Sequence, residues 1–406
     1  MISPGQGRRL PAIDAIRGFA VLGILVMNIV AMGLPPYAYV DPHHHGGADG
    51  ANLAAWAIAY VLADGKMRAL FTMLFGASML IAAERDGNRA APHLVRMAWL
   101  FLFGMVHAWG FWFGDILVQY AVAGAILSVA RRWPVRALLF AAACCFAVML
   151  ADDMLAWTQL GALKAAAALP DAPDGVIDAW AHILAEASPP PARIAREIAL
   201  YRGGVADVFA ARAPTTWMFQ TVLLPLTLAE TLGYAALGMA LHRLGFFAGR
   251  WAEPAYRACV GAGVAAAMLT VPVAAMLVAA RFDPATIPLA DALTFLLRPW
   301  IALAYAAAIV LAVRSGRMRD VFGRLAAAGR MALSNYLGST LIATTLFYGY
   351  GFGLYARLER AELYCVVAAI WLIILAWSQP WLDRFAYGPA EWLWRALTRR
   401  TLAIAK

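Results

Sequence analysis

Residues 12–33 read AIDAIRGFAVLGILVMNIVAMG, an apolar run with one charged pair near its start. A helix needs about 20 mostly apolar residues to cross the hydrocarbon core of a bilayer, so this stretch predicts a transmembrane helix. No A-x-A cleavage site follows it, so we expect a span and not a removable signal. The same length criterion predicts nine further spans: 66–83, 94–112, 115–130, 137–157, 217–243, 257–280, 289–312, 328–348 and 362–380.

The composition indicates a membrane protein. Of the 406 residues, 63% are hydrophobic and only 14% are charged, whereas an ordinary soluble domain carries about 25% charged residues. This excludes a soluble enzyme, a disordered chain and a nucleic-acid binder. The net charge of +9 needs no nucleic-acid partner, because basic cytoplasmic loops produce the same balance. We predict an all-α fold, a polytopic transmembrane helical bundle of about ten spans within a lipid bilayer.

Arginine and lysine predict the orientation of the bundle. They collect in both termini and in the loops after spans two, four, six and eight, and ten spans place all these segments on one side. Basic short loops stay in the cytoplasm, so both termini are predicted to be cytoplasmic. We divide the chain into an N-terminal bundle over 1–157 with an outer loop at 34–65, an outer insertion at 158–216, and a C-terminal bundle with a basic tail over 217–406.

The two outer segments have their own expected structure. The apolar run 51–63 in the first of them is too short to cross the bilayer and is expected to lie at the outer interface. The insertion 158–216 is the one extended polar stretch, and its proline run interrupts any helix. We expect two or three short outer helices there.

A charged group at membrane depth costs at least about 2.5–3.5 kcal/mol, so each one needs a reason. Asp14 and Arg17 lie three residues apart on one helical face and can pair. They form either a structural ion pair at the cytoplasmic rim or a site for a phosphorylated ligand, in which arginine supplies a planar fork. Asn28 lies on the same predicted span, roughly 21 Å farther out by the rise of a helix.

His107 is the only histidine placed deep within a predicted span. It is either a neutral histidine sealed by one hydrogen bond or a general base, because an imidazole with a pKa of about 6.5 can accept a proton at neutral pH. Asp115 follows at a tight turn, where it either orients the imidazole or caps the next helix. The run from His43 to His45 lacks a second cluster of ligands, and we expect no metal.

Further polar residues fall within predicted spans: Glu230, Arg298, Arg330, Ser334, Asn335 and Tyr336. Glu230 and Arg298 have opposite charges and are candidates to neutralise each other, although sequence alone does not pair them. The charged residues at the outer start of the second span are interpreted as interfacial anchors: Asp64, Lys66 and Arg68.

Several motifs together resemble the YeiB-like family of bacterial multi-pass proteins. They are residues 9–20 with Asn28, the stretch from Lys66 to Gly76, His107 to Asp115 with Tyr120, residues 329–337 and residues 388–395. These blocks cover most of the chain. That family is similar to the transmembrane acyltransferase superfamily, which includes the lysosomal heparan-glucosaminide acetyltransferase.

The resemblance implies an integral-membrane acyltransferase of the bacterial inner membrane. Such an enzyme moves an acyl group from cytoplasmic acyl-CoA, with acetyl-CoA as the expected donor, to a sugar, glycan or other small acceptor at the outer side. The resemblance also implies a catalytic histidine and an internal channel for acyl-CoA. We assign catalysis to His107, Asp115 and Asn28. Residues assigned to acyl-CoA binding are Asp14, Arg17, Arg330, Asn335 and Tyr336; Asn335 is the alternative to Asn28 as oxyanion donor.

Two other functions stay open. A proton-coupled transporter or exporter of a small anionic metabolite would use Asp14, Arg17, His107 and Glu230 as its proton and substrate path. A non-catalytic membrane scaffold would need none of them. The oligomeric state is also open, with a homodimer as one form.

Overall fold

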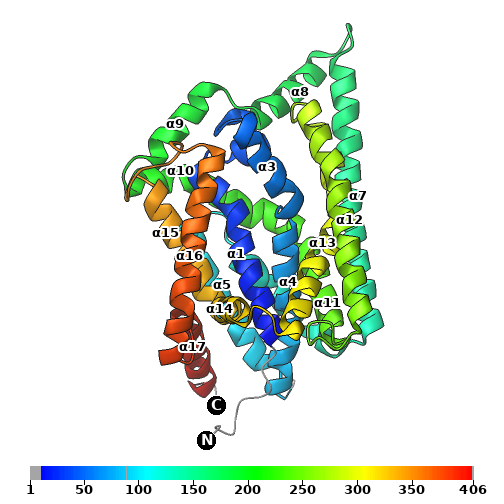
Figure 1. The fold of residues 1–406 in the computed structure, drawn as a ribbon. Coiled ribbons are helices and arrows are strands. Elements are labelled where there is room, and N and C mark those ends of the chain that lie inside the picture. Colours follow the sequence, from blue (N-terminus) through cyan, green and yellow to red (C-terminus); the bar gives the residue numbers. More distant parts are fainter. Residues whose placement is uncertain (1–10, 88, 405–406) are drawn as a thin grey trace, which may run out of the picture.

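A computed structural model describes residues 11–87 and 89–404, and every regular element within them is helical. Figure 1 shows a bundle of long helices around α1. The elements in chain order are α1 (Pro11–Gly33), α2 (Tyr37–Val40), η1 (Pro42–His44), α3 (Gly50–Leu62), α4 (Lys66–Arg85), α5 (Ala90–Gly110), α6 (Leu117–Ile126), η2 (Leu127–Arg132), α7 (Val135–Ala167), α8 (Asp174–Ala187), α9 (Pro191–Tyr201), α10 (Val205–Met218), η3 (Phe219–Leu223), α11 (Leu224–Arg243), α12 (Glu253–Ala279), α13 (Ile287–Ser315), α14 (Arg319–Arg330), α15 (Ala332–Phe347), α16 (Arg360–Arg384) and α17 (Pro389–Ile404). The predicted all-α fold is confirmed.

Within the described residues, 7 helical stretches are long and apolar enough to cross a membrane. They are α1, α3 with α4, α7, α10 with α11, α12, α13 and α16. The chain is therefore a multi-pass protein of the lipid bilayer. Three of the ten predicted spans, 94–112, 115–130 and 328–348, fall instead on α5, on α6 with η2, and on α14 with α15.

Length and polarity explain these three differences. Helix α5 has 21 residues, but His93, Arg96 and His107 lower its hydropathy. Helix α6 has only 10 residues before it tightens into the 3₁₀ helix η2. The predicted span 328–348 is interrupted at Met331, which leaves 16 residues for α15.

The run 51–63 forms α3, and its position at an outer interface stays a prediction. It joins α4 in one apolar stretch of 36 residues and packs on α12 and α16. The junction needs glycine, because Gly65 has a φ of +70° and a Cβ there would lie 2.6 Å from Cδ of Arg298. The insertion 158–216 contains the end of α7, then α8, α9 and most of α10, so the predicted short helices are present.

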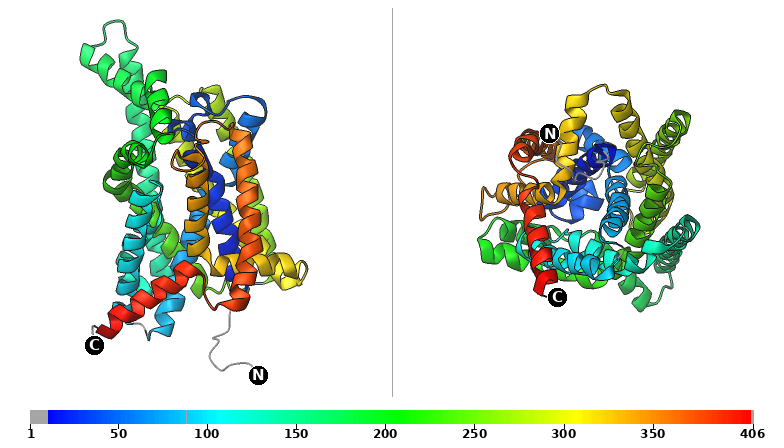
Figure 2. Two further views of the ribbon diagram at one scale, coloured as in Figure 1. Left: turned by 90° about the vertical axis from the view of Figure 1, so that its left-hand side faces the viewer. Right: turned by 90° about the horizontal axis from the view of Figure 1, so that it is seen from below.

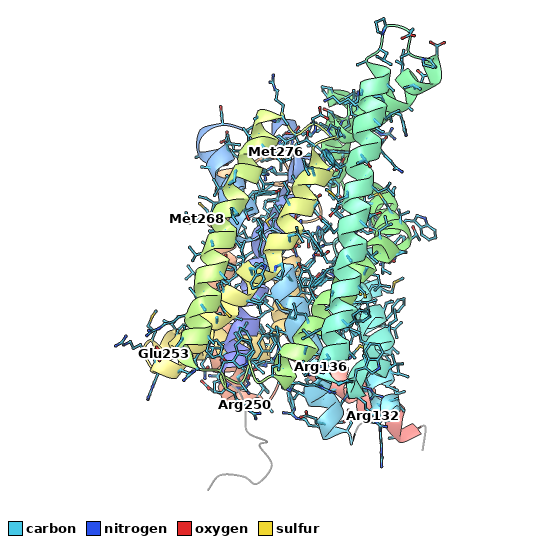
Figure 3. The ribbon with its side chains drawn as sticks, turned by 90° about the vertical axis from the view of Figure 1, so that its right-hand side faces the viewer. Arg132, Arg136, Arg250, Glu253, Met268 and Met276 are labelled. Carbon is cyan, nitrogen blue, oxygen red and sulfur yellow. The ribbon has the colours of Figure 1, made fainter. Side chains whose placement is uncertain are left out.

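The two ends of the bundle carry different elements. The start of α1 and the whole of α17 lie at one end, and α8 and α9 lie at the other (Figure 1). Arg132, Arg136 and Arg250 lie at the end where α1 begins (Figure 3). Helix α17 runs obliquely across that same end (Figure 2). That this end faces the cytoplasm stays a prediction, as does the division into 1–157, 158–216 and 217–406.

Cysteine labelling in intact cells tests the orientation. In a background without the four native cysteines, Ala181→Cys in α8 should react with a membrane-impermeant maleimide from outside. Gly323→Cys in α14 should react only after permeabilisation. Both positions are exposed in the structure, so failure to react reports sidedness and not burial. The reverse pattern would invert the topology.

Helices from the two halves of the chain pack directly on each other. Helix α1 packs on α14, and α4 packs on α11. A Cβ on Gly18 would overlap the carbonyl oxygen of Leu325, and a Cβ on Gly329 would overlap that of Asp14. Small residues of this kind let helix backbones approach closely. The α1–α14 crossing therefore holds the beginning of α1 against α14.

Candidate functional site

A cavity of about 1070 Å³ opens among α1, α3, α4, α6, α7, the α9–α11 segment and α13. It lies in the half of the bundle that carries α8 and α9, since Ile24, Asn28, Glu186 and Arg193 line it. A volume of this size is typical of pockets for small molecules. The cavity is therefore the candidate functional site.

An ion-pair network crosses the cavity wall between three helices. Nη2 of Arg68 on α4 donates to Oε2 of Glu230 on α11 at 2.7 Å. Nη1 of Arg298 on α13 lies 3.8 Å from Oε1 of Glu230, and its Nη2 lies 3.2 Å from Oδ1 of Asp291. The predicted neutralisation of Glu230 by Arg298 is confirmed, but Arg68 is the closer partner.

The network retains unused hydrogen-bonding capacity. Among the described residues, Nε of Arg68, Nε of Arg298 and Oε1 of Glu230 are buried without a hydrogen-bond partner. A buried polar group without a partner is costly, so native proteins rarely leave one unpaired. Water or a ligand in the cavity is the available partner.

The interpretation of Lys66 and Arg68 as interfacial anchors is wrong. Lys66 is 1% exposed, and its Nζ donates to the carbonyl oxygen of Tyr60 at 2.6 Å. Arg68 belongs to the ion-pair network. Asp64 lines the cavity and accepts a hydrogen bond from the Tyr39 hydroxyl at 3.0 Å.

The rim of the cavity formed by α2, the end of α8 and α9 carries both signs of charge. Arg193 pairs with Glu186 at 3.0 Å and lies over the ring of Tyr37, 5.5 Å from its centroid. The Arg193 hydrogen bond lowers the pKa of the Glu186 carboxyl. Burial raises the pKa of Glu197, although Tyr355 donates a hydrogen bond to it and Arg193 lies near.

His107 and Asp115 form a pair. Nδ1 of His107 lies 2.8 Å from Oδ1 of Asp115, and both side chains are 2% exposed. Nε2 of His107 is buried without a hydrogen-bond partner among the described residues. The ring lies against Tyr336, with centroids 5.0 Å apart. Asp115 lines the cavity and His107 does not, so the imidazole lies behind the cavity wall.

Asp115 performs both roles that sequence analysis left open. While Oδ1 holds the imidazole, Oδ2 accepts a hydrogen bond from the Val118 amide at 2.8 Å and so caps the first turn of α6. The turn is held from the other side by Arg212 of α10, whose guanidinium donates to the carbonyl oxygens of Trp109 and Phe111. A cation at the last carbonyls of α5 is favourable there.

Sequence analysis missed Arg212. It lies near the end of the polar insertion 158–216, where the sequence does not distinguish a buried arginine from an exposed one. Its side chain is instead 3% exposed. Only its packing against the end of α5 reveals that it positions the His107–Asp115 turn.

Asn28 lines the cavity, as Asp115 does. Its side-chain amide has no hydrogen-bond partner among the described residues and is only partly buried. It is therefore free to donate to a ligand. The alternative oxyanion donor, Asn335, is committed: its amide donates to Ala328 and Ser378, and its oxygen accepts from Trp377.

The residues assigned to acyl-CoA lie outside the cavity. Asp14 and Arg17 form the predicted pair at 3.0 Å, and Nη2 of Arg17 donates to Oγ of Ser78 at 2.9 Å. Both terminal nitrogens of Arg17 are thus engaged within the protein. On α1 the cavity lining begins at Ile24, seven residues beyond Arg17 or about 10 Å along the helix.

The other residues assigned to acyl-CoA binding lie on two helices. Arg330 is the last residue of α14, adjacent to the Gly329 contact with Asp14. Asn335 and Tyr336 lie on α15, where Tyr336 contacts His107 and its hydroxyl accepts a hydrogen bond from the Ile116 amide at 3.4 Å. The structure therefore places Arg330 one residue from the contact between α14 and α1, and Tyr336 with the His107–Asp115 pair.

The histidine run points in three directions. Nδ1 of His43 contacts Asp41 at 2.7 Å, Nε2 of His44 contacts the Ala187 carbonyl at 3.0 Å, and Nε2 of His45 contacts the Ala356 carbonyl at 3.2 Å. The run ties the outer loop to α8 and to the segment before α16. None of the histidines in the described part of the chain lines the cavity.

Comparisons with known proteins identify relatives along nearly the whole chain. Residues 241–401 match the family described as "Protein of unknown function (DUF418)". The chain is 32% identical over 393 residues to "Uncharacterized protein YeiB" of Escherichia coli (strain K12), with 96% of each chain covered. It is 28% identical over 414 residues to "Uncharacterized protein YxaH" of Bacillus subtilis (strain 168), covering 96% of this chain and 94% of the relative. No solved structure matches. The chain belongs to the YeiB family of multi-pass membrane proteins.

Proposed function

We propose that the protein is an acyltransferase of the bacterial inner membrane that uses cytoplasmic acyl-CoA, acetyl-CoA among its donors, to acylate a small acceptor such as a sugar in the outer cavity. The observation that carries the proposal is the His107–Asp115 pair at the cavity wall. One imidazole nitrogen is held by a carboxylate and the other is free, which is the arrangement of a histidine general base.

In this mechanism the pair moves one proton. Once the cavity wall in front of the imidazole opens, Nε2 of His107 accepts the proton of the acceptor hydroxyl or amine as the oxygen or nitrogen attacks the thioester carbonyl carbon. Asn28 donates a hydrogen bond to the carbonyl oxygen, on which negative charge develops. When the carbon–sulfur bond breaks, the pair returns the proton to the leaving thiolate. The products are the acylated acceptor and free CoA.

Acyl-CoA can reach the cavity from the Asp14–Arg17 end only if part of the protein moves. Arg17 and Ile24 are separated by about two helical turns of packed side chains, so the thioester reaches the cavity only when this layer opens. An arginine held by Asp14 and Ser78 is poised to exchange one of these contacts for a phosphate. Arg330, beside the same crossing, adds a second positive charge.

Release of free CoA by the purified protein in detergent tests the reaction. Wild-type protein should release CoA from acetyl-CoA or a longer acyl-CoA, faster when an acceptor is present. Arg17→Lys keeps the charge but loses the planar fork. It should weaken acyl-CoA affinity about tenfold or more, because a charge-assisted hydrogen bond contributes about 1.5–3 kcal/mol.

The matched control is Arg257→Lys. Arg257 is an exposed arginine at the same end of the bundle, and its one ion-pair partner among the described residues is Glu253. Its affinity for acyl-CoA should equal that of the wild type. If Arg17→Lys binds acyl-CoA as tightly as Arg257→Lys does, the donor site lies elsewhere.

A second function is favoured by one specific observation: the cavity is lined by an ion-pair network but by none of the described histidines. Buried charges that face a cavity are also typical of transporter substrate paths. In that case the protein is a proton-coupled transporter of a small anionic metabolite. Uptake into proteoliposomes driven by a pH gradient, without release of CoA, would identify it.

A further inference from the structure

The cavity presents charged groups of both signs that the protein only half satisfies. The side chains of Arg68 and Asp291 are 41% and 46% exposed although they lie within the bundle, because they face the cavity. Among the described residues, each side chain has one partner: Nη2 of Arg68 is bound to Glu230, and Oδ1 of Asp291 is bound to Arg298. Nη1 of Arg68 and Oδ2 of Asp291 are available to a ligand, whereas Nε of Arg68 is buried.

Asp153 adds a second free carboxylate. It lies on α7, which packs against α13, and it lines the same cavity as Asp291. Asp153 has no hydrogen-bond or ion-pair partner among the described residues, and it lies within electrostatic range of Asp291 and Arg298. Two carboxylates with free oxygens on neighbouring helices favour a positively charged group between them.

Buried polar atoms show that the site is incomplete without a ligand or water. Glu230 is 3% exposed and Arg298 is 9% exposed, and Oε1 of the first and Nε of the second lack a hydrogen-bond partner. Both residues line the cavity. The charges therefore form a polar pocket that a ligand with both signs of charge can complete.

The rest of the cavity lining is largely apolar. It includes four methionines from four helices: Met27, Met67, Met149 and Met218. Methionine is flexible and polarizable, so it suits apolar ligands of variable shape. Helix α7, which forms one side, is only 11% buried along its apolar window, so a single helix layer separates this side of the cavity from the membrane.

We propose that the cavity binds a zwitterionic amphiphile, with its ammonium group between Asp153 and Asp291, its anionic group against Arg68, and its apolar part along the apolar lining that includes the four methionines. The chemistry is that of an aminophospholipid headgroup or of a soluble zwitterion of the same kind. This proposal concerns ligand binding and goes beyond the proposed acyl transfer. It does not depend on that reaction, because a transporter would bind the same ligand in the same pocket.

Binding of short-chain lipids to the purified protein tests the proposal. Dihexanoyl phosphatidylethanolamine should raise the melting temperature and titrate to saturation below its micellar concentration. Dihexanoyl phosphatidylglycerol, which has the phosphate but no ammonium, should bind at least tenfold more weakly. Glycerophosphoethanolamine, which has the headgroup without chains, distinguishes the sources: equal affinity identifies a soluble ligand, and weaker affinity identifies a lipid.

Asp153→Asn and Asp152→Asn are a matched pair of variants. The two residues are neighbours and lose the same charge, but Asp152 is exposed and does not line the cavity. Asp153→Asn should weaken phosphatidylethanolamine binding about tenfold to hundredfold, as expected for a lost charge-assisted hydrogen bond. Asp152→Asn should bind like the wild type.

Folding is not at risk in this comparison, because Asp153 has no internal partner to lose; the unliganded melting temperature checks this. Equal affinity for the two lipids, or equal effects of the two variants, would overturn the proposal. CoA release is measured separately, so a failure of lipid binding and a failure of acyl transfer are distinct results.

Discussion

His107→Gln should lower acyl-CoA-dependent turnover by about 10²–10⁴, the usual effect of removing a general base. A glutamine amide can donate a hydrogen bond to Asp115 but cannot take a proton from the acceptor. The variant should keep acyl-CoA affinity, because His107 lies on α5, away from the Asp14–Arg17 pair. Single-turnover CoA release at saturating donor measures the chemical step directly.

His93→Gln is the matched control. His93 lies on the same helix, is also 2% exposed, and makes a single hydrogen bond through Nε2 to the Gly124 carbonyl at 2.9 Å. The effect of His93→Gln on turnover measures the structural cost of replacing a buried histidine that is not the proposed base. If both glutamine variants retain similar turnover, His107 is a structural residue that fastens the α5–α6 turn.

Asp115→Ser separates the two roles of that carboxylate. Serine is a good helix cap, so it can still accept the Val118 amide hydrogen bond. It cannot hold the imidazole as a carboxylate does. Thermal stability should therefore stay near that of the wild type while turnover falls. Unchanged turnover in Asp115→Ser would show that the helix cap, which serine retains, is the only role of Asp115.

Local patterns in the sequence were sufficient for much of the fold. An apolar run of fixed length predicted α1, α7, α12, α13 and α16, because helix length is dictated by bilayer thickness. The Asp14–Arg17 pair followed from spacing on one helical face. The break between α3 and α4 was located from the sequence, because the run 51–63 ends and the span 66–83 begins on either side of it. The break at Met331 falls inside the predicted span 328–348, and no local pattern located it.

The candidate site was only partly predictable for the same reason. His107 and Asp115 are eight residues apart, so one tight turn brings them together. Arg68 and Glu230 are 162 residues apart, and their pairing depends on how α4 packs on α11. A charged residue near the predicted end of a span resembles an interfacial anchor until its partner is known. For this reason the sequence analysis wrongly interpreted Arg68 as an interfacial anchor.

Glu230→Gln should be among the most destabilising conservative substitutions in the chain. Glu230 is 3% exposed and is the one anion that Arg68 and Arg298 share. Removing one partner of a fully buried ion pair typically costs about 3–5 kcal/mol; the cost here should be smaller, because the Arg68 side chain is 41% exposed and Arg298 keeps its pair with Asp291. Thermal unfolding in detergent, followed by tryptophan fluorescence and by the folded fraction on size exclusion, should show a large decrease in midpoint.

The control is Glu253→Gln, which removes the same charge from an exposed pair. Glu253 and Arg257 are 53% and 72% exposed and lie four residues apart on α12, and such surface pairs contribute about 0–1 kcal/mol. A double variant, Glu230→Gln with Arg68→Gln, should recover part of the lost stability, because it removes the cation that loses its ion-pair partner, whereas Arg298 keeps its pair with Asp291. If Glu230→Gln and Glu253→Gln shift the midpoint equally, the ion-pair network does not hold α4, α11 and α13 together. Its charges would then be retained for the ligand in the cavity alone.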